Sequence, residues 1–225
     1  GKMLAIAGDD FCMGKHADGM PDPRYVVGEG GVLPNGFFFA NKGPHKDYTF
    51  TPDMSPSKGM AVKQVGCMYE PHVFGVMVGQ EFAVANDDET QHNVHTKPKR
   101  NKEANISQDA GKSDTFVFPS EEKAIPFACD IHSWMSAYAF ALKHPFFATT
   151  DENGAFEIKG LPEGDYEFVG WHEEFGKVTG EVTVDIVTND GDGFSVTFPP
   201  GTEPLDGADE ITITVLKVKG NTVRI

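Results

Sequence analysis

Short runs rich in phenylalanine and valine, interrupted every few residues by glycine or proline, dominate this sequence. The chain has 225 residues, of which 25 are glycine and 15 are proline. The segments between these turn residues are long enough for strands but too short for long helices, and no long amphipathic helical pattern is visible. The sequence therefore predicts an all-β protein, long enough for one large domain or two small ones.

The charge of the chain limits its partners. The formal net charge is −15 at pH 7, so a nucleic acid would be repelled over most of the surface and we expect no such partner. A basic protein partner fits this charge, but so does a role in solubility alone, and composition does not separate the two. No stretch is long and apolar enough to span a membrane. Residues 1–8 read as a strand, and we expect any export signal to have been removed.

One short segment carries the strongest chemical signal. Cys129, His132 and Met135 follow one another in the pattern Cys-x2-His-x2-Met, between two predicted strands. A thiolate, an imidazole and a thioether on one tight loop suit a soft or borderline metal ion. With a second histidine they complete a trigonal His2Cys set with a weak axial methionine, which is the geometry of blue-copper electron-transfer sites.

The second histidine must come from a neighbouring strand end, where the chain offers His92 and His95 in the run Gln-His-Asn-Val-His. In a strand these two side chains point to opposite faces, so only one of them can bind the metal from the strand itself. The His-Asn-Val-His run and the Cys-x2-His-x2-Met loop together resemble the amicyanin-like cupredoxins, over about residues 62–142. The resemblance implies a Greek-key β-sandwich and selects His92 over His95. It assigns one copper ion to His92, Cys129, His132 and Met135.

The same resemblance gives roles to the neighbours of these ligands. Asn93 is expected to steady the Cys129 sulfur through its amide. His132 is expected at the protein edge, where Ile131 and Trp134 would form the patch that a redox partner contacts. The chain departs from the family at the residue after this histidine, which is serine where proline is expected, so the potential and colour of the site stay open.

These residues predict a mononuclear type 1 copper protein that transfers single electrons. We expect an electron-transfer protein and not an enzyme, because no open coordination position, general base or oxyanion site is evident. Its partner would be a cytochrome or a dehydrogenase in the periplasm or the extracellular space. Two other interpretations stay open: a copper-binding or copper-delivery protein, and a cell-surface interaction module with a structural metal. Zinc is the alternative metal, although it prefers closed sites without methionine.

The cysteine count leaves one cysteine unpaired. If Cys129 is the metal thiolate, Cys12 and Cys67 can form a disulfide in an exported protein; two unrelated buried thiols are the alternative. For some other histidines we favour a surface or packing role over a second metal site or an interdomain contact. These are His16, His72, His144 and His172.

Residues 151–166 carry a second motif, in which Asp-Glu-Asn-Gly-Ala-Phe-Glu-Ile is followed by Leu-Pro-Glu-Gly-Asp-Tyr. The run resembles the carboxypeptidase-regulatory-like (transthyretin-like) β-sandwich family. Its Asn-Gly pair predicts a hairpin between strands at 146–150 and 155–158. Together with a cupredoxin-like part, it resembles proteins labelled as methylamine-utilisation proteins.

These resemblances imply a split arrangement of domains. We expect a copper domain at 61–145, inserted into a second, smaller β-sandwich made of residues 1–50 and 146–225. Residues 51–60 would be a linker, and one enlarged copper domain is the alternative.

Two further expectations concern local structure. The polar, partly basic residues 97–114 predict a loop with at most a short helix, and residues 211–215 predict a strand.

Overall fold

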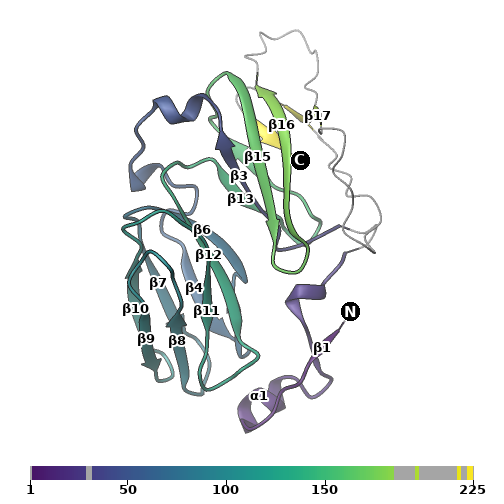
Figure 1. Cartoon of the computed structure of the whole chain (residues 1–225). Coiled ribbons are helices and arrows are strands. Elements are labelled where there is room, and N and C mark those ends of the chain that lie inside the picture. Colours follow the sequence, from purple (N-terminus) through teal and green to yellow (C-terminus); the bar gives the residue numbers. More distant parts are fainter. Residues whose placement is uncertain (1, 29–31, 185–195, 198–216, 219–221, 225) are drawn as a thin grey trace. The chain divides into compact units, whose positions relative to one another are not determined.

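The chain folds into strands and turns with few helices, so the all-β prediction is confirmed (Figure 1). The computed structural model describes residues 2–28, 32–184, 196–197, 217–218 and 222–224. It divides the chain into two compact units, Gly1–Val26 with Phe50–Pro145 and Val27–Thr49 with Phe146–Ile225. Among the described residues, no helix has the length and apolar character that a crossing of the bilayer requires.

Two sheets pack face to face in the described part of the first unit. Their strand orders are β10-β7-β4-β5 and β6-β12-β11-β8-β9 (Figure 1). The chain crosses between the sheets repeatedly, which is the connectivity of a Greek-key sandwich. The strands are β4 (Ala61–Val65), β5 (Met68–Glu70), β6 (Val73–Met77), β7 (Glu81–Asn86), β8 (His92–Thr96), β9 (Ala104–Gln108), β10 (Ser113–Val117), β11 (Glu122–Ala128) and β12 (Ser136–Leu142).

Alternate residues of these strands point into a shared apolar core, as the two-residue period of a strand requires. Phe127 of β11 lies within it, with its ring centroid 5.5 Å from that of Phe74 and 6.1 Å from that of Tyr69. Tyr69 belongs to one sheet and Phe74 to the other. Burial of each such ring stabilises the fold by about 1.5–3 kcal/mol relative to exposure, and the rings hold the two sheets together.

The strand directions bring several loops to one end of this sandwich. β4 and β7 run parallel, so the turn at 66–67 and the loop at 87–91 leave the sheet at the same edge. β8 runs antiparallel to β11, with His95 opposite Ala128. The loop at 129–135 therefore leaves β11 close to the point where β8 begins.

The N-terminal segment Gly1–Val26 belongs to the first unit, where the expected domain borders placed it with the second. It contains β1 (Met3–Leu4), α1 (Asp10–Lys15), β2 (Met20–Pro21) and a 3₁₀ turn, η1 (Pro23–Tyr25). A disulfide joins Cys12 to Cys67, and Thr90 donates a hydrogen bond to Asp9 at 2.9 Å. These contacts join residues far apart in the chain; the cysteine count predicted the disulfide, whereas the local sequence pattern carries no signal for the hydrogen bond.

The expected linker at 51–60 also lies in the first unit. It begins with the 3₁₀ turn η4 (Pro52–Met54). Ser57 donates a hydrogen bond from its hydroxyl to the Gly75 carbonyl at 2.6 Å, and its own carbonyl accepts one from the Gln80 side chain at 2.9 Å. The segment is therefore attached to β6 and the turn that follows it.

Residues 97–114 contain a strand, so the predicted loop is wrong there. β9 pairs antiparallel with β8, from Ala104 opposite Thr96 to Gln108 opposite His92. It is one of the two edge strands of its sheet. Edge strands carry polar residues on their exposed face, which is why the composition of this stretch resembled that of a loop.

The second unit, taken by itself, is also built of sheets. The strand orders are β13-β3-β15-β16-β17 and β14-β19-β18. The 3₁₀ turn η3 (Pro44–Asp47) follows β3. The strands are β3 (Phe37–Lys42), β13 (Phe147–Thr149), β14 (Glu157–Lys159), β15 (Gly164–His172), β16 (Gly176–Val184), β17 (Val196–Thr197), β18 (Lys217–Val218) and β19 (Thr222–Arg224).

The hairpin predicted around the Asn-Gly pair is wrong. The turn itself forms, since the Asp151 N–H donates to the Ala155 carbonyl at 2.9 Å, but β13 pairs with β3 and β14 pairs with β19. The strands on either side therefore belong to different sheets. In the Leu-Pro-Glu-Gly-Asp-Tyr run, the Tyr166 hydroxyl donates to the Pro162 carbonyl at 2.8 Å and closes the turn. The strand expected at 211–215 lies outside the described residues.

Candidate metal centre

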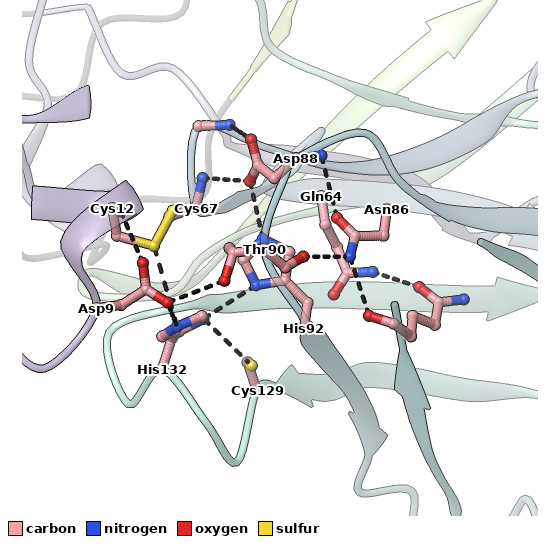
Figure 2. A network of polar contacts seen from close by, with 12 residues as sticks. Asp9, Cys12, Gln64, Cys67, Asn86, Asp88, Thr90, His92, Cys129 and His132 are labelled. Carbon is pink, nitrogen blue, oxygen red and sulfur yellow. Dashed lines mark hydrogen bonds and ion pairs between the residues drawn. A yellow bond between two sulfur atoms is a disulfide. The ribbon is translucent and has the colours of Figure 1, made fainter. Parts of the chain in front are cut away.

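His92 opens β8 and its side chain is fully buried. Its Nε2 donates a hydrogen bond to the Asp88 carboxylate at 2.8 Å (Figure 2). The two oxygens of this carboxylate also accept the backbone N–H groups of Gly66 and Cys67, each at 2.7 Å. Because the carboxylate assigns the proton to Nε2, the Nδ1 atom of His92 carries a free lone pair.

The protonation state of His92 agrees with this assignment. Burial lowers the pKa of His92 below its ordinary value, and the Asp88 carboxylate acts in the opposite direction with a smaller effect. A metal ion binds the neutral imidazole. The ring is therefore held in the form that a metal requires.

The loop between β11 and β12 presents the other candidate ligands. The Met135 N–H donates to the His132 carbonyl at 3.0 Å, and the Cys129 N–H donates to the Met135 carbonyl at 3.3 Å. These bonds close a tight turn. Cys129 is 3% exposed, and the Met135 side chain is 1% exposed within the core of the sandwich.

Three donor atoms of these residues lie close together. The Nδ1 atoms of His92 and His132 are 2.9 Å apart, and the Cys129 sulfur lies 3.9 Å from Nδ1 of His132. All three donors are within 4.8 Å of one another. The backbone N–H of Asn93 donates to the Cys129 sulfur at 3.3 Å.

His132 is buried, so its expected position at the protein edge is wrong. Its side chain is 1% exposed because the N-terminal segment covers it: Nε2 lies 3.3 Å from the Asp9 carboxylate and 4.0 Å from the Cys12 sulfur (Figure 2). Asp9 caps the first turn of α1 by accepting the Cys12 N–H at 2.9 Å, and this bond is the main cause that lowers the pKa of Asp9. Asp9 is 123 residues from His132, and sequence reasoning missed it.

Trp134 and Ile131 occupy different positions around His132. The Trp134 ring is partly buried, lies with its centroid 5.0 Å from that of His132, and donates its Nε1–H to the Cys67 carbonyl at 3.2 Å. Ile131 is 47% exposed. In this part of the loop, Ile131 is thus an exposed apolar side chain.

Cys12 and Cys67 form a disulfide, and Cys129 is a free, buried cysteine. The bond ties α1 to the turn at 66–67. His16, one of the histidines given a surface role, donates from Nε2 to the Gly66 carbonyl at 2.6 Å and adds a second tie to the same turn.

His95 lies away from the cluster. Its Nδ1 is 2.8 Å from the Asp130 carboxylate and its Nε2 is 2.9 Å from that of Glu103. The hydrogen bond to Asp130, followed by that to Glu103, raises the pKa of His95 above its ordinary value. The clustered donor groups among the described residues do not include His16, His72, His144 or His172.

The two imidazoles meet with one ring nitrogen of each facing the other. Asp88 and Asp9 hold the Nε2 protons of His92 and His132, so the facing Nδ1 atoms, 2.9 Å apart, both present lone pairs. Two lone pairs at this distance repel each other unless a proton or a metal ion lies between them. Nitrogen ligands about 2 Å from one metal ion fall roughly 3 Å apart. The donor set therefore fits a single metal ion.

The fold and the site define this chain as an all-β sandwich protein with a buried cluster of two imidazoles and one thiol. No protein-family model matches the chain, and no curated protein matches it. Among solved structures it is similar to a Cu-containing nitrite reductase from Thermus scotoductus SA-01, at 15% identity and a TM-score of 0.36. That match covers 46% of this chain and 27% of the reductase, so the chain spans about a quarter of the length of that enzyme.

Structures of amicyanin variants are similar as well. A Cu(I) form is 18% identical with a TM-score of 0.34, over 41% of this chain and 90% of the other. A reduced form is 17% identical with a TM-score of 0.34, over 46% of this chain and 97% of the other. The resemblance of residues 151–166 to the transthyretin-like family stays a prediction, as does that to methylamine-utilisation proteins.

Proposed function

We propose that the protein binds one copper ion in a type 1 site and transfers single electrons. The ligands in this proposal are His92, Cys129 and His132, with Met135 as a weak axial ligand. The observation that supports it most is the approach of two imidazole Nδ1 atoms to 2.9 Å beside a buried cysteine sulfur. A trigonal His2Cys set with methionine suits copper, whereas zinc has little use for the thioether.

The chain's own residues keep such a site rigid. Bound copper supplies the one-electron Cu(I)/Cu(II) couple. Asp88 and Asp9 fix the orientation of the two imidazoles through Nε2, and the Asn93 N–H points at the thiolate sulfur. Hydrogen bonds of this kind tune the redox potential of copper sites. Because these hydrogen bonds hold the ligands in place, the ligands change position little between oxidation states. Small changes of position favour rapid electron transfer.

The burial of the site supports an electron carrier over an enzyme or a delivery protein. His92, Cys129 and His132 are each at most 3% exposed, so neither a substrate nor an acceptor of copper can reach the donor atoms directly. Electrons, in contrast, pass through a few ångströms of packed protein. We place partner docking at the exposed Ile131, and the net charge of −15 favours a partner with a basic face, such as a cytochrome or a dehydrogenase.

The compartment in this proposal is the periplasm or the extracellular space. The Cys12–Cys67 disulfide supports it, because disulfides persist in oxidising compartments and are rare in the cytosol.

Visible absorption and EPR spectra of the Cu(II)-loaded protein test the proposal. The wild type and His95→Gln, which alters a histidine outside the cluster, are expected to show an intense thiolate-to-copper band. Cys129→Ser is expected to lose that band while remaining folded by far-UV circular dichroism. A colourless wild type that holds zinc in preference to copper, by native mass spectrometry after competition, overturns the type 1 assignment.

A further inference from the structure

The N-terminal segment reaches the proposed copper site through one carboxylate. Asp9 Oδ2 lies 3.3 Å from Nε2 of His132 and accepts the Thr90 hydroxyl at 2.9 Å (Figure 2). Its other oxygen accepts the Cys12 N–H at 2.9 Å. The Asp9 carboxylate is thus in contact with Cys12, Thr90 and His132, and His132 is a proposed copper ligand.

We propose that Asp9 is a positioning residue of the copper site, which lowers its reduction potential through His132 and depends on the Cys12–Cys67 disulfide to stay there. This inference rests on the proposed function. It gives a function to the N-terminal segment Gly1–Val26, which lies outside the two sheets and adds no strand to them. The segment is a covalently tied part of the redox centre.

The effect of Asp9 on the potential follows from its charge and its hydrogen bond. A carboxylate that accepts the Nε2 proton makes the imidazole a stronger electron donor through Nδ1. It also places a negative charge beside the metal. Both effects stabilise Cu(II) more than Cu(I), because the higher charge gains more from each. Removal of the carboxylate therefore raises the reduction potential.

The disulfide sets the position of Asp9. Cys12 follows Asp9 by three residues within the capped turn of α1, and its bond to Cys67 attaches that turn to the sandwich. The other described ties near it are the hydrogen bonds from Thr90 to Asp9 and from His16 to Gly66, and the packing of Ile6 and Phe11 against the core. The helix α1 has six residues. Without the disulfide it is far too short to stay ordered by itself. Loss of the bond is expected to release Asp9 from His132.

Direct electrochemistry of the copper-loaded full chain at one pH tests this. Asp9→Asn is expected to change the ratio of Cu(II) to Cu(I) affinity about tenfold, which corresponds to a rise of about 59 mV in potential. Asp10→Asn is the matched control: it removes the same charge from the adjacent residue, whose side chain is exposed. Its potential is expected to stay close to that of the wild type.

The role of the disulfide is tested by combination. The Cys12→Ser/Cys67→Ser variant is expected to show a similar rise, and Asp9→Asn added to it is expected to cause little further change. Should the paired cysteine variant not fold, Thr90→Val tests the positioning of Asp9 with the disulfide intact, because it removes one of the hydrogen bonds that hold Asp9. An intermediate rise is expected there.

Two results overturn the inference while leaving the proposed function in place. The first is a thiolate-to-copper band in all variants with equal potentials for Asp9→Asn and Asp10→Asn. The second is a rise in potential in the combined variant that equals the sum of the rises seen in Asp9→Asn and in Cys12→Ser/Cys67→Ser. If the wild type itself has no such band, the proposed function fails, and this inference fails with it.

Discussion

Asp88 and His92 are joined by a buried hydrogen bond of 2.8 Å that closes one side of the candidate metal centre. The same carboxylate holds the turn at 66–67 through two backbone N–H groups. A single side chain thus sets the tautomer of a proposed ligand and the position of the turn that carries Cys67. It links the site to the disulfide.

Asp88→Asn is expected to weaken copper binding about 10- to 100-fold, because the amide no longer fixes the Nε2 proton of His92 by charge. The control is Asp87→Asn, which alters an exposed neighbour that pairs with Lys63 at 3.1 Å on the surface. Competition titration with a copper chelator measures both. Equal affinities for the two variants would show that Asp88 does not orient the ligand.

Tyr69→Phe is expected to lower the free energy of unfolding by about 1–3 kcal/mol. The buried phenol contacts the carbonyls of Asn93 at 2.6 Å and Ala128 at 3.0 Å, and so bridges the two strands that carry the ligands. Burial raises the pKa of Tyr69 above its ordinary value, which keeps the hydroxyl protonated as a donor. Urea unfolding followed through the thiolate-to-copper band measures the loss.

Tyr25→Phe is the control for this experiment. The centroid of the Tyr25 ring lies 3.8 Å from the Lys2 ammonium and 5.4 Å from the Arg24 guanidinium. A phenylalanine ring retains both contacts. Its unfolding free energy is expected to stay within about 0.5 kcal/mol of the wild type. A Tyr69→Phe variant as stable as this control contradicts the bridging role.

The hydrogen-bonded pair of His95 and Asp130 predicts that the stability of the folded protein depends on pH. The folded pKa of His95 is raised above its unfolded value of about 6.5, so the folded state binds this proton more tightly. The stability that the pair contributes is therefore full below about pH 6.5 and is lost as the pH rises through the raised folded pKa. NMR titration of the copper-free protein is expected to show His95 above its ordinary range, and Asp130→Asn is expected to bring it down. An unchanged His95 titration in that variant would rule out Asp130 as the main cause.

The Cys12→Ser/Cys67→Ser variant is expected to be less stable by about 4 kcal/mol in the chain-entropy model, since the bond closes a loop with a sequence separation of 55. Unfolding of the first unit in urea measures this loss. Limited proteolysis gives an independent check: cleavage within residues 1–26 is expected in the variant and not in the oxidised wild type. A variant that resists both tests would show that hydrogen bonds and the packing of Ile6 and Phe11 hold the segment without the disulfide.

Much of the fold and part of the site could be predicted from local patterns. Two-residue alternation predicts strands such as β7, and the Cys-x2-His-x2-Met spacing keeps Cys129 and His132 on one tight turn wherever the chain goes. The same kind of reasoning failed for β9, because a polar edge strand resembles a loop in composition. It also failed at the Asn-Gly turn, since a turn predicts a change of direction and not the pairing partner of each strand.

Local patterns in the sequence predict that this protein is built of strands and that a thiol and an imidazole lie close together on one loop. They do not predict that Asp9 covers His132 or that the N-terminal segment joins the proposed copper unit, which the folded chain shows. The difference lies in the range of the interactions. Alternation and motif spacing act over a few residues, whereas a carboxylate 123 residues away meets its histidine only through the long-range contacts of the folded chain.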